Sequence, residues 1–136
     1  MRNLEGLRIL VVDDEPFMRR TIRAVLRAID HFDVEEAPDG DLALDLVAVF
    51  RPDVVLCDIA MPRMGGLQFV AHLREHPVAE LRLIPVIILT GHADETTVLD
   101  AARLQVSSFV VKPVSPNRLR AHLQTIFANR YVSLST

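Results

Sequence analysis

This sequence of 136 residues has one cysteine, no long apolar run and no excess of basic residues. The one cysteine, Cys57, cannot form an internal disulfide, which suits a reducing compartment. No apolar run approaches the ~20 residues of a membrane span, so we expect no membrane insertion and a cytoplasmic location. Lys and Arg number 15 against 18 Asp and Glu, which gives a formal charge of −3. Because nucleic-acid-binding domains usually carry a basic face, we expect no direct contact with nucleic acid.

Internal linkers and low-complexity tracts are also missing, so we expect one domain to fill residues 1–136. This length is sufficient to bury most of the apolar surface in a single core. The strand and helix patterns lie within a core of about residues 7–128, and residues 129–136 are expected to form a tail.

Five short apolar runs predict β-strands. Four of them are rich in Val and Ile and do not alternate with polar residues, which is typical of strands buried on both faces of a sheet. The second run is diluted by histidine and acidic residues and is expected at the edge of the sheet. The runs are Leu7–Val12, His31–Ala37, Asp53–Cys57, Ile84–Leu89 and Ser107–Val111.

Between these runs, apolar residues recur at the spacing of a helix. In the first such segment, Phe17, Ile22 and Leu26 are expected on the apolar face, with four arginines largely outside it. Further helices are expected within residues 38–50, 65–76, 93–104 and 115–130. Strand and helix thus alternate five times with short connections. This pattern predicts an α/β fold: a doubly wound, five-stranded parallel sheet of flavodoxin-like order 2-1-3-4-5, with helices on both faces.

Polar side chains stand at the carboxyl ends of four of the predicted strands: Asp13 and Asp14, Asp58, Thr90, and Lys112. Ligands bind at these ends in open α/β sheets, and the first and third strands are neighbours where the winding reverses. We therefore expect Asp13, Asp14 and Asp58 to meet. Thr90 and Lys112 are expected to approach from the other side of the third strand.

Three carboxylates in one pocket repel each other, by about 4 kcal/mol for a pair 4 Å apart at an effective dielectric constant near 20. An oxygen-rich site without His or Cys favours a hard divalent ion. Mg²⁺ fits best, because it is usually held by one or two carboxylates together with phosphate oxygens. With Lys112 and the Thr90 hydroxyl, such a site would receive a dianionic tetrahedral group, towards which Asp58 can act as a nucleophile.

Four motifs carry a resemblance to a known family. They are ILVVDDEP (Ile9–Pro16), VVLCDIAMPRMGG (Val54–Gly66), VIILTG (Val86–Gly91) and FVVKP (Phe109–Pro113). In this order, and at the ends of these strands, they resemble the CheY-like receiver domain of two-component response regulators. The resemblance runs from about residue 7 to residue 128.

The resemblance implies a phosphoacceptor switch of a two-component system. Asp58 would take a phosphoryl group from a histidine kinase or a histidine phosphotransfer protein, with Mg²⁺ as cofactor. Asp14 would bind the metal directly and Asp13 mainly through water. Asp58 and the backbone carbonyl of Ala60 would complete the protein's ligands.

The same resemblance assigns roles on the far side of the pocket. Lys112 would pair with the phosphoryl oxygens, and Thr90 would move to hydrogen-bond one of them. Phe109 matches the aromatic switch position, which turns inward when Thr90 moves. The bond between Lys112 and Pro113 is expected to be cis.

Transfer and hydrolysis at Asp58 would be self-catalysed, so no turnover of an external substrate is expected. The output would be a changed surface on the last two helices and the strand between them, offered to a downstream effector protein; a homodimer is left open. The start at Met1 and the short tail favour a stand-alone receiver acting by protein contact. The alternative is the N-terminal receiver of a longer regulator, with its DNA-binding or enzymatic output domain missing.

Two other classes share the architecture. A flavin- or nucleotide-binding protein would place Gly, Ser or Thr after the first strand to hold phosphate, whereas Asp13, Asp14 and Glu15 would repel it. A metal-dependent phosphatase would need a second acid poised for hydrolysis and a capping insert, and neither is evident.

The arginines of the first helix have two interpretations. They can form a solvated face, or they can dock an acidic partner such as a kinase. These arginines are Arg19, Arg20, Arg23 and Arg27.

Overall fold

The computed structural model describes residues 4–92 and 94–128 and contains a five-stranded parallel sheet. The strand order is β2-β1-β3-β4-β5, which confirms the predicted fold class and order. The strands are β1 (Arg8–Val12), β2 (Asp33–Ala37), β3 (Val54–Asp58), β4 (Val86–Thr90) and β5 (Ser108–Val111). The predicted tail at residues 129–136 lies outside the described residues.

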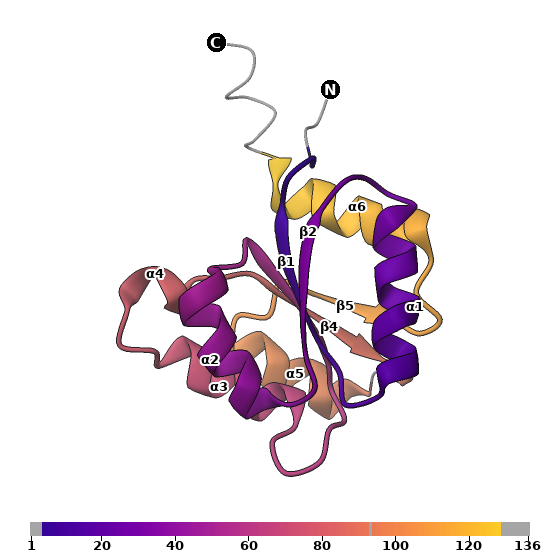
Figure 1. Ribbon diagram of the computed structural model, residues 1–136. Coiled ribbons are helices and arrows are strands. Elements are labelled where there is room, and N and C mark those ends of the chain that lie inside the picture. The colour runs from indigo at the N-terminus through magenta and orange to yellow at the C-terminus, as the bar shows by residue number, and fades with distance from the viewer. Residues whose placement is uncertain (1–3, 93, 129–136) are drawn as a thin grey trace.

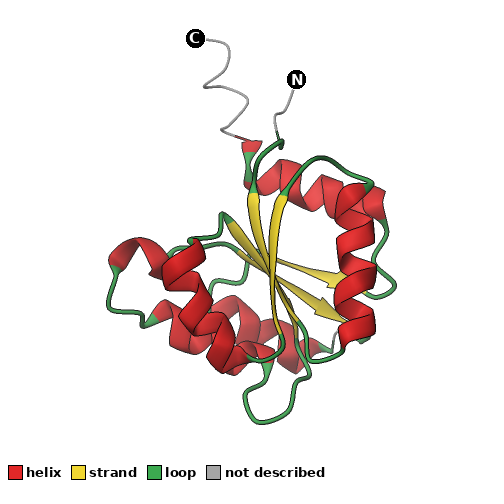
Figure 2. Cartoon of the chain, in the orientation of Figure 1, coloured by secondary structure: helices red, strands yellow, loops and turns green. Residues whose placement is uncertain are grey.

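Helices cover both faces of this sheet (Figures 1 and 2). The helices are α1 (Pro16–Arg27), α2 (Gly40–Phe50), α3 (Gly66–Arg74), α4 (Ala79–Arg82), α5 (Glu95–Arg103) and α6 (Pro116–Ile126). One core cluster packs buried residues of α2 and α3 against the sheet, and a second packs those of α1 and α6. No helix in the described part of the chain is long and apolar enough to cross a membrane.

Strand β1 shows how the sheet serves two cores. Leu10 and Val12 belong to the cluster with α2 and α3, whereas Ile9 and Val11 belong to the cluster with α1 and α6. Successive side chains of a strand point to opposite faces, so a strand buried on both sides must be apolar throughout. All five residues of β3 and of β4 are buried, while β2 alternates exposed and partly buried positions before a buried Ala37. The expected edge position of the second strand is confirmed.

Within residues 4–92 and 94–128, the structure has one helix more than the five expected. Helix α4 is a single turn between α3 and β4, held to the core by the buried Leu81. Four residues are too few to show a helical period, which is why the sequence pattern did not reveal it. Three of the other helices, α2, α5 and α6, carry ordinary caps: the side chains of Asp39, Asp94 and Ser115 accept hydrogen bonds from backbone N–H groups in the following turn.

The apolar face of α1 differs by one residue from the prediction. Phe17 was expected to be on that face, but it is 69% exposed. Met18 packs against the core instead, and together with Ile22, Val25 and Leu26 it gives the helical spacing of i, i+4, i+7 and i+8. The ring of Phe17 lies outside, with the guanidinium carbon of Arg20 at 6.0 Å from its centroid.

Arg74 of α3 ties three segments together. Its guanidinium donates hydrogen bonds of 2.7–3.0 Å to the backbone carbonyls of Arg82, Ile84, Leu104 and Gln105. These carbonyls lie at the end of α4, before β4 and just after α5, so one side chain satisfies acceptors that the helix ends leave unpaired. The carboxyl end of α5 is therefore anchored to α3.

The start of α3 lies directly against the end of β3. A Cβ atom at Gly66 would stand 2.4 Å from the backbone oxygen of Asp58, closer than real Cβ contacts. The Gly66 N–H donates a 2.9 Å hydrogen bond to the carbonyl of Ile59. The glycine thus allows the loop after β3 to close onto the backbone that carries Asp58.

Replacing Gly66 by alanine should push the α3 start away from Asp58. We expect Gly66→Ala to lower the free energy of unfolding by about 2 kcal/mol, the usual range for overpacking, measured by urea denaturation. Gly91→Ala is the control, because a Cβ there would meet no atom within 4 Å. Equal stability of the two variants would contradict this close approach.

Candidate functional site

Four strand ends meet at one edge of the sheet. Asp58 is the last residue of β3 and Thr90 the last of β4, while Asp13 and Lys112 come directly after β1 and β5. The register explains the meeting: β3 lies between β1 and β4, and Asp58 pairs with Leu89 in the ladder. The parallel strands therefore deliver these side chains to a common place.

Lys112 is the cation that faces the buried carboxylates. Its Nζ donates a 3.1 Å hydrogen bond to Oδ1 of Asp58 and lies 3.7 Å from Oδ2 of Asp13. Asp58 is 8% exposed and Asp13 only 1%. Because buried charges are stable only when paired, Lys112 accounts for part of the charge of this pocket, but one ammonium cannot balance two or three carboxylates.

Asp13 is the least satisfied of these carboxylates. Its Oδ1 accepts a 2.9 Å hydrogen bond from the backbone N–H of Glu15, whereas Oδ2 is buried without a hydrogen-bond partner. Burial raises the pKa of Asp13 above its ordinary value, and the neighbouring charges of Asp58 and Asp14 add to this, against the opposing effects of the Glu15 N–H and Lys112. An orphaned, buried carboxylate oxygen of this kind indicates a place for a cation.

The three acidic residues together fit a hard metal ion. Asp13, Asp14 and Asp58 can each offer one carboxylate oxygen, and these atoms lie within 4.8 Å of one another. Oxygen ligands alone, one of them without a hydrogen-bond partner, match the preference of Mg²⁺. Ala60, whose backbone carbonyl was predicted as a further ligand, lies exposed in the loop after β3.

The hydroxyl of Thr90 is held by its own loop. Thr90 Oγ1 donates to the backbone oxygen of His92 at 2.7 Å and accepts from the His92 N–H at 3.1 Å. The backbone N–H of Lys112 donates to the carbonyl of Thr90 at 2.7 Å, which joins the ends of β4 and β5. Thr90 is buried, whereas the side chain of His92 is exposed.

The remaining predicted positions lie close to this edge. Phe109 on β5 is partly buried and packs against the core cluster of α2 and α3. The peptide bond between Lys112 and Pro113 is cis, as expected. Cys57, next to Asp58, is fully buried, and burial raises the pKa of its thiol. A neutral, inaccessible thiol packs as a small apolar side chain.

The sequence analysis missed one residue that contacts this site and a second that supports it from outside. Arg19 donates from Nη1 to the backbone oxygen of Asp13 at 2.6 Å and from Nε to Oε1 of Glu36 at 3.0 Å. Arg23 pairs through its Nε with the other oxygen of Glu36. Two of the four arginines interpreted as a solvated or docking face thus pair with Glu36 of the same chain. The only signal in the sequence was the helical spacing of Arg19 and Arg23.

Comparisons with known proteins agree with this arrangement. The family model for the response regulator receiver domain matches residues 9–124. The chain is 38% identical over 117 residues to the regulatory protein AtoC of Escherichia coli, covering 86% of this chain but only 24% of AtoC. It is 32% identical to the chemotaxis protein CheY-3 of Vibrio cholerae, covering 90% of this chain and 93% of that protein.

A solved structure gives the same result in three dimensions. The chemotaxis protein CheY4 of Vibrio cholerae superposes with a TM-score of 0.80 at 28% identity, covering 89% of this chain and 98% of that one. The family model spans most of the chain, and the structure brings together the acidic cluster (Asp13, Asp14 and Asp58) and Lys112 at the strand ends. The chain therefore belongs to the response regulator receiver domain family, the signalling switches of two-component systems.

Proposed function

We propose that Asp58 is the phosphoacceptor of this receiver domain. The observation that carries the proposal is a buried Asp58 carboxylate, bound to Lys112 at 3.1 Å, beside an Asp13 oxygen that has no hydrogen-bond partner. A carboxylate at the end of a rigid, fully buried strand is fixed in one place and partly shielded from water. Both properties suit a nucleophile whose product is an acyl phosphate.

In the proposed transfer, a carboxylate oxygen of Asp58 attacks the phosphorus of a phosphohistidine on the donor protein. The P–N bond breaks, its electron pair stays on the imidazole nitrogen, and a mixed anhydride forms on Asp58. The Lys112 ammonium, now on Oδ1 of Asp58, is placed to donate to a phosphoryl oxygen instead. It would thereby stabilise charge that the unmodified carboxylate does not carry.

Mg²⁺ is the cofactor in this proposal. Asp13, Asp14 and Asp58, with the backbone carbonyl of Ala60, would hold it. When bound, the metal supplies neutralising charge for the carboxylates and the phosphoryl oxygens. Of the chain's own residues, Asp14 would be the direct ligand and Asp13 would act mainly through water.

The switch would use Thr90 and Phe109. The Thr90 hydroxyl is occupied by the loop residue His92, so a new phosphoryl acceptor would compete with a hydrogen bond of 2.7 Å. Movement of Thr90 would leave space into which the partly buried Phe109 can turn. The surface altered in this way would be that of α5, β5 and α6, and so available to a downstream effector.

The phosphoryl donor, the cellular location and the domain organisation of the protein also belong to this proposal. The donor would be a histidine kinase or a histidine phosphotransfer protein, acting in the cytoplasm, and Asp58 would react without turnover of an external substrate. We favour a receiver that acts alone by protein contact, on its match along 93% of CheY-3. The match to 24% of AtoC supports the alternative, a receiver within a longer regulator.

Phosphorylation can be measured directly as intact mass. With Mg²⁺ and acetyl phosphate, we expect one phosphoryl adduct on the wild-type protein, none on Asp58→Asn, and none after chelation. Asp45→Asn, the same substitution on the exposed face of α2, should keep the adduct. Absence of an adduct on the wild-type protein under all these conditions would contradict the proposal.

The role of Asp13 in the metal site can be tested by thermal unfolding. In chelator, Asp13→Asn should be more stable than the wild type by about 1 kcal/mol, because it removes a charge that is buried without full compensation. Saturating Mg²⁺ should stabilise the wild type more than this variant. Asp33→Asn, on the exposed edge of β2, should match the wild type both in its stability in chelator and in its stabilisation by Mg²⁺. Equal Mg²⁺ stabilisation of all three proteins would exclude Asp13 from the site.

The coupling of Thr90 to Phe109 can be followed by NMR. We expect acetyl phosphate and Mg²⁺ to shift the ring signals of Phe109 in the wild type. Thr90→Ala should still form the adduct but lose most of that shift, because it lacks the hydroxyl that moves. Thr21→Ala, whose hydroxyl bonds only within α1, is the control. A full shift in Thr90→Ala would show that Phe109 responds by another route.

A further inference from the structure

One short segment of β2 holds both backbone polar groups of Asp13, the N–H directly and the carbonyl through Arg19. The Asp13 N–H donates to the carbonyl of Ala37 at 3.1 Å. The Asp13 carbonyl accepts from Nη1 of Arg19 at 2.6 Å, and Nε of the same guanidinium donates to Glu36 at 3.0 Å. Because Glu36 and Ala37 are consecutive, these contacts close a ring around the backbone of Asp13.

This ring acts on Asp14 as well as on Asp13. The carbonyl bound by Arg19 belongs to the peptide that joins the two aspartates, and a peptide unit is planar. Fixing its oxygen therefore fixes the direction in which the chain enters Asp14. We propose that Arg19 and Glu36 are positioning residues for the acidic cluster, which they hold ready for a divalent cation; this inference rests on the proposed function of that cluster.

The charges of Arg19 and Glu36 balance each other, which allows an arginine to lie close to a cation site. A lone arginine beside a cation site would repel the incoming metal, but here Glu36 balances it. The hydrogen bond from Arg23, with help from Arg19, holds the pKa of Glu36 below its ordinary value, so this side chain is a carboxylate at neutral pH. Arg19 can then serve as a rigid two-pronged donor, a role that lysine cannot fill with a single nitrogen.

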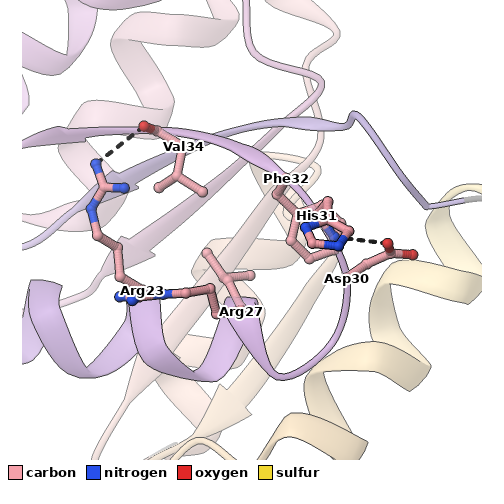
Figure 3. A pocket seen from close by; sticks show the side chains of 7 residues that line it. Arg23, Arg27, Asp30, His31, Phe32 and Val34 are labelled. Carbon is pink, nitrogen blue, oxygen red and sulfur yellow. Dashed lines mark hydrogen bonds between the residues drawn. The ribbon is translucent and has the colours of Figure 1, made fainter.

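Arg23 is the outer member of the same network. It pairs with Glu36. It also donates from Nη2 to the carbonyl of Val34 at 3.1 Å, as Figure 3 shows. It also lines a cavity of about 420 Å³ together with Arg27 and Phe32. Its side chain is 37% exposed, against 16% for Arg19. Among the described contacts, none joins Arg23 to Asp13, so Arg23 shares the ion pair of Arg19 without its contact with the site.

This difference supplies a matched pair of variants. Arg19→Met and Arg23→Met each remove one guanidinium that pairs with Glu36, but only the first leaves the Asp13 carbonyl without its donor. Mg²⁺ affinity would be measured by following the backbone amide of Asp14 in an NMR titration of the full chain, with thermal unfolding recorded alongside. This readout is independent of phosphorylation.

A pure charge effect and a positioning role predict opposite changes in the Mg²⁺ affinity of Arg19→Met. If only charge mattered, removing either arginine would strengthen Mg²⁺ binding, because a nearby cation is lost. Positioning predicts that Arg19→Met weakens it by about tenfold, as loss of a supporting contact commonly does, while Arg23→Met leaves it unchanged or slightly tighter. Arg19→Lys, which keeps the charge, should also bind Mg²⁺ about threefold more weakly than the wild type.

The outcomes separate this inference from the proposed function. Unchanged or tighter binding by Arg19→Met or Arg19→Lys, with normal binding by the wild type, would overturn the positioning role alone. Equal weakening by Arg19→Met and Arg23→Met would also overturn it, since Arg23 does not touch Asp13. A wild-type chain that neither binds Mg²⁺ nor forms the Asp58 adduct would overturn the proposed function itself.

Discussion

The ion pair between Asp58 and Lys112 is the contact on which the site depends. The two residues are 54 positions apart, and they meet because β3, β4 and β5 assemble in parallel register. Lys112 reaches two of the acidic groups but cannot neutralise the cluster. The remaining negative charge is a cost to the fold that a divalent cation can relieve. If the site binds a cation, its affinity for that cation and the incomplete stability of the metal-free site would have the same cause, which is the excess negative charge.

Contacts with the backbone also help to keep this unfavourable cluster in place. Gly66 lets the α3 start close onto the carbonyl of Asp58, and the N–H of Glu15 holds one oxygen of Asp13. Arg19 holds the carbonyl between Asp13 and Asp14. Like charges would separate if their backbone were mobile. Rigid support from several elements at once is what allows them to remain close.

Features that depend on local patterns could be predicted from the sequence. Contacts that depend on how a helix is rotated over the sheet could not. Strand ends and their polar residues follow from the apolar runs and from the rule that parallel strands present their carboxyl ends together, so Asp13, Asp14, Asp58 and Lys112 could be grouped. Apart from its helical spacing to Arg23, no local pattern distinguishes Arg19 from its neighbour Arg20. That choice depends on which side of β2 carries Glu36 and how α1 is rotated over the sheet. The single turn of α4 is too short to produce a periodic signal.

The rotation of α1 over the sheet separates the residues that support the acidic cluster from those that are exposed to a partner. Its inner arginines are bound to β2 and to the acidic cluster, whereas Arg20 and Phe17 lie together on the outer surface near the helix start. The docking hypothesis for this helix therefore narrows to its outer residues. A partner that contacts Phe17 would rest on the first turn of α1, the same turn that holds the Asp13 carbonyl through Arg19. Recognition of the donor and geometry of the acceptor site would then share one rigid element, and a displaced α1 would impair both together.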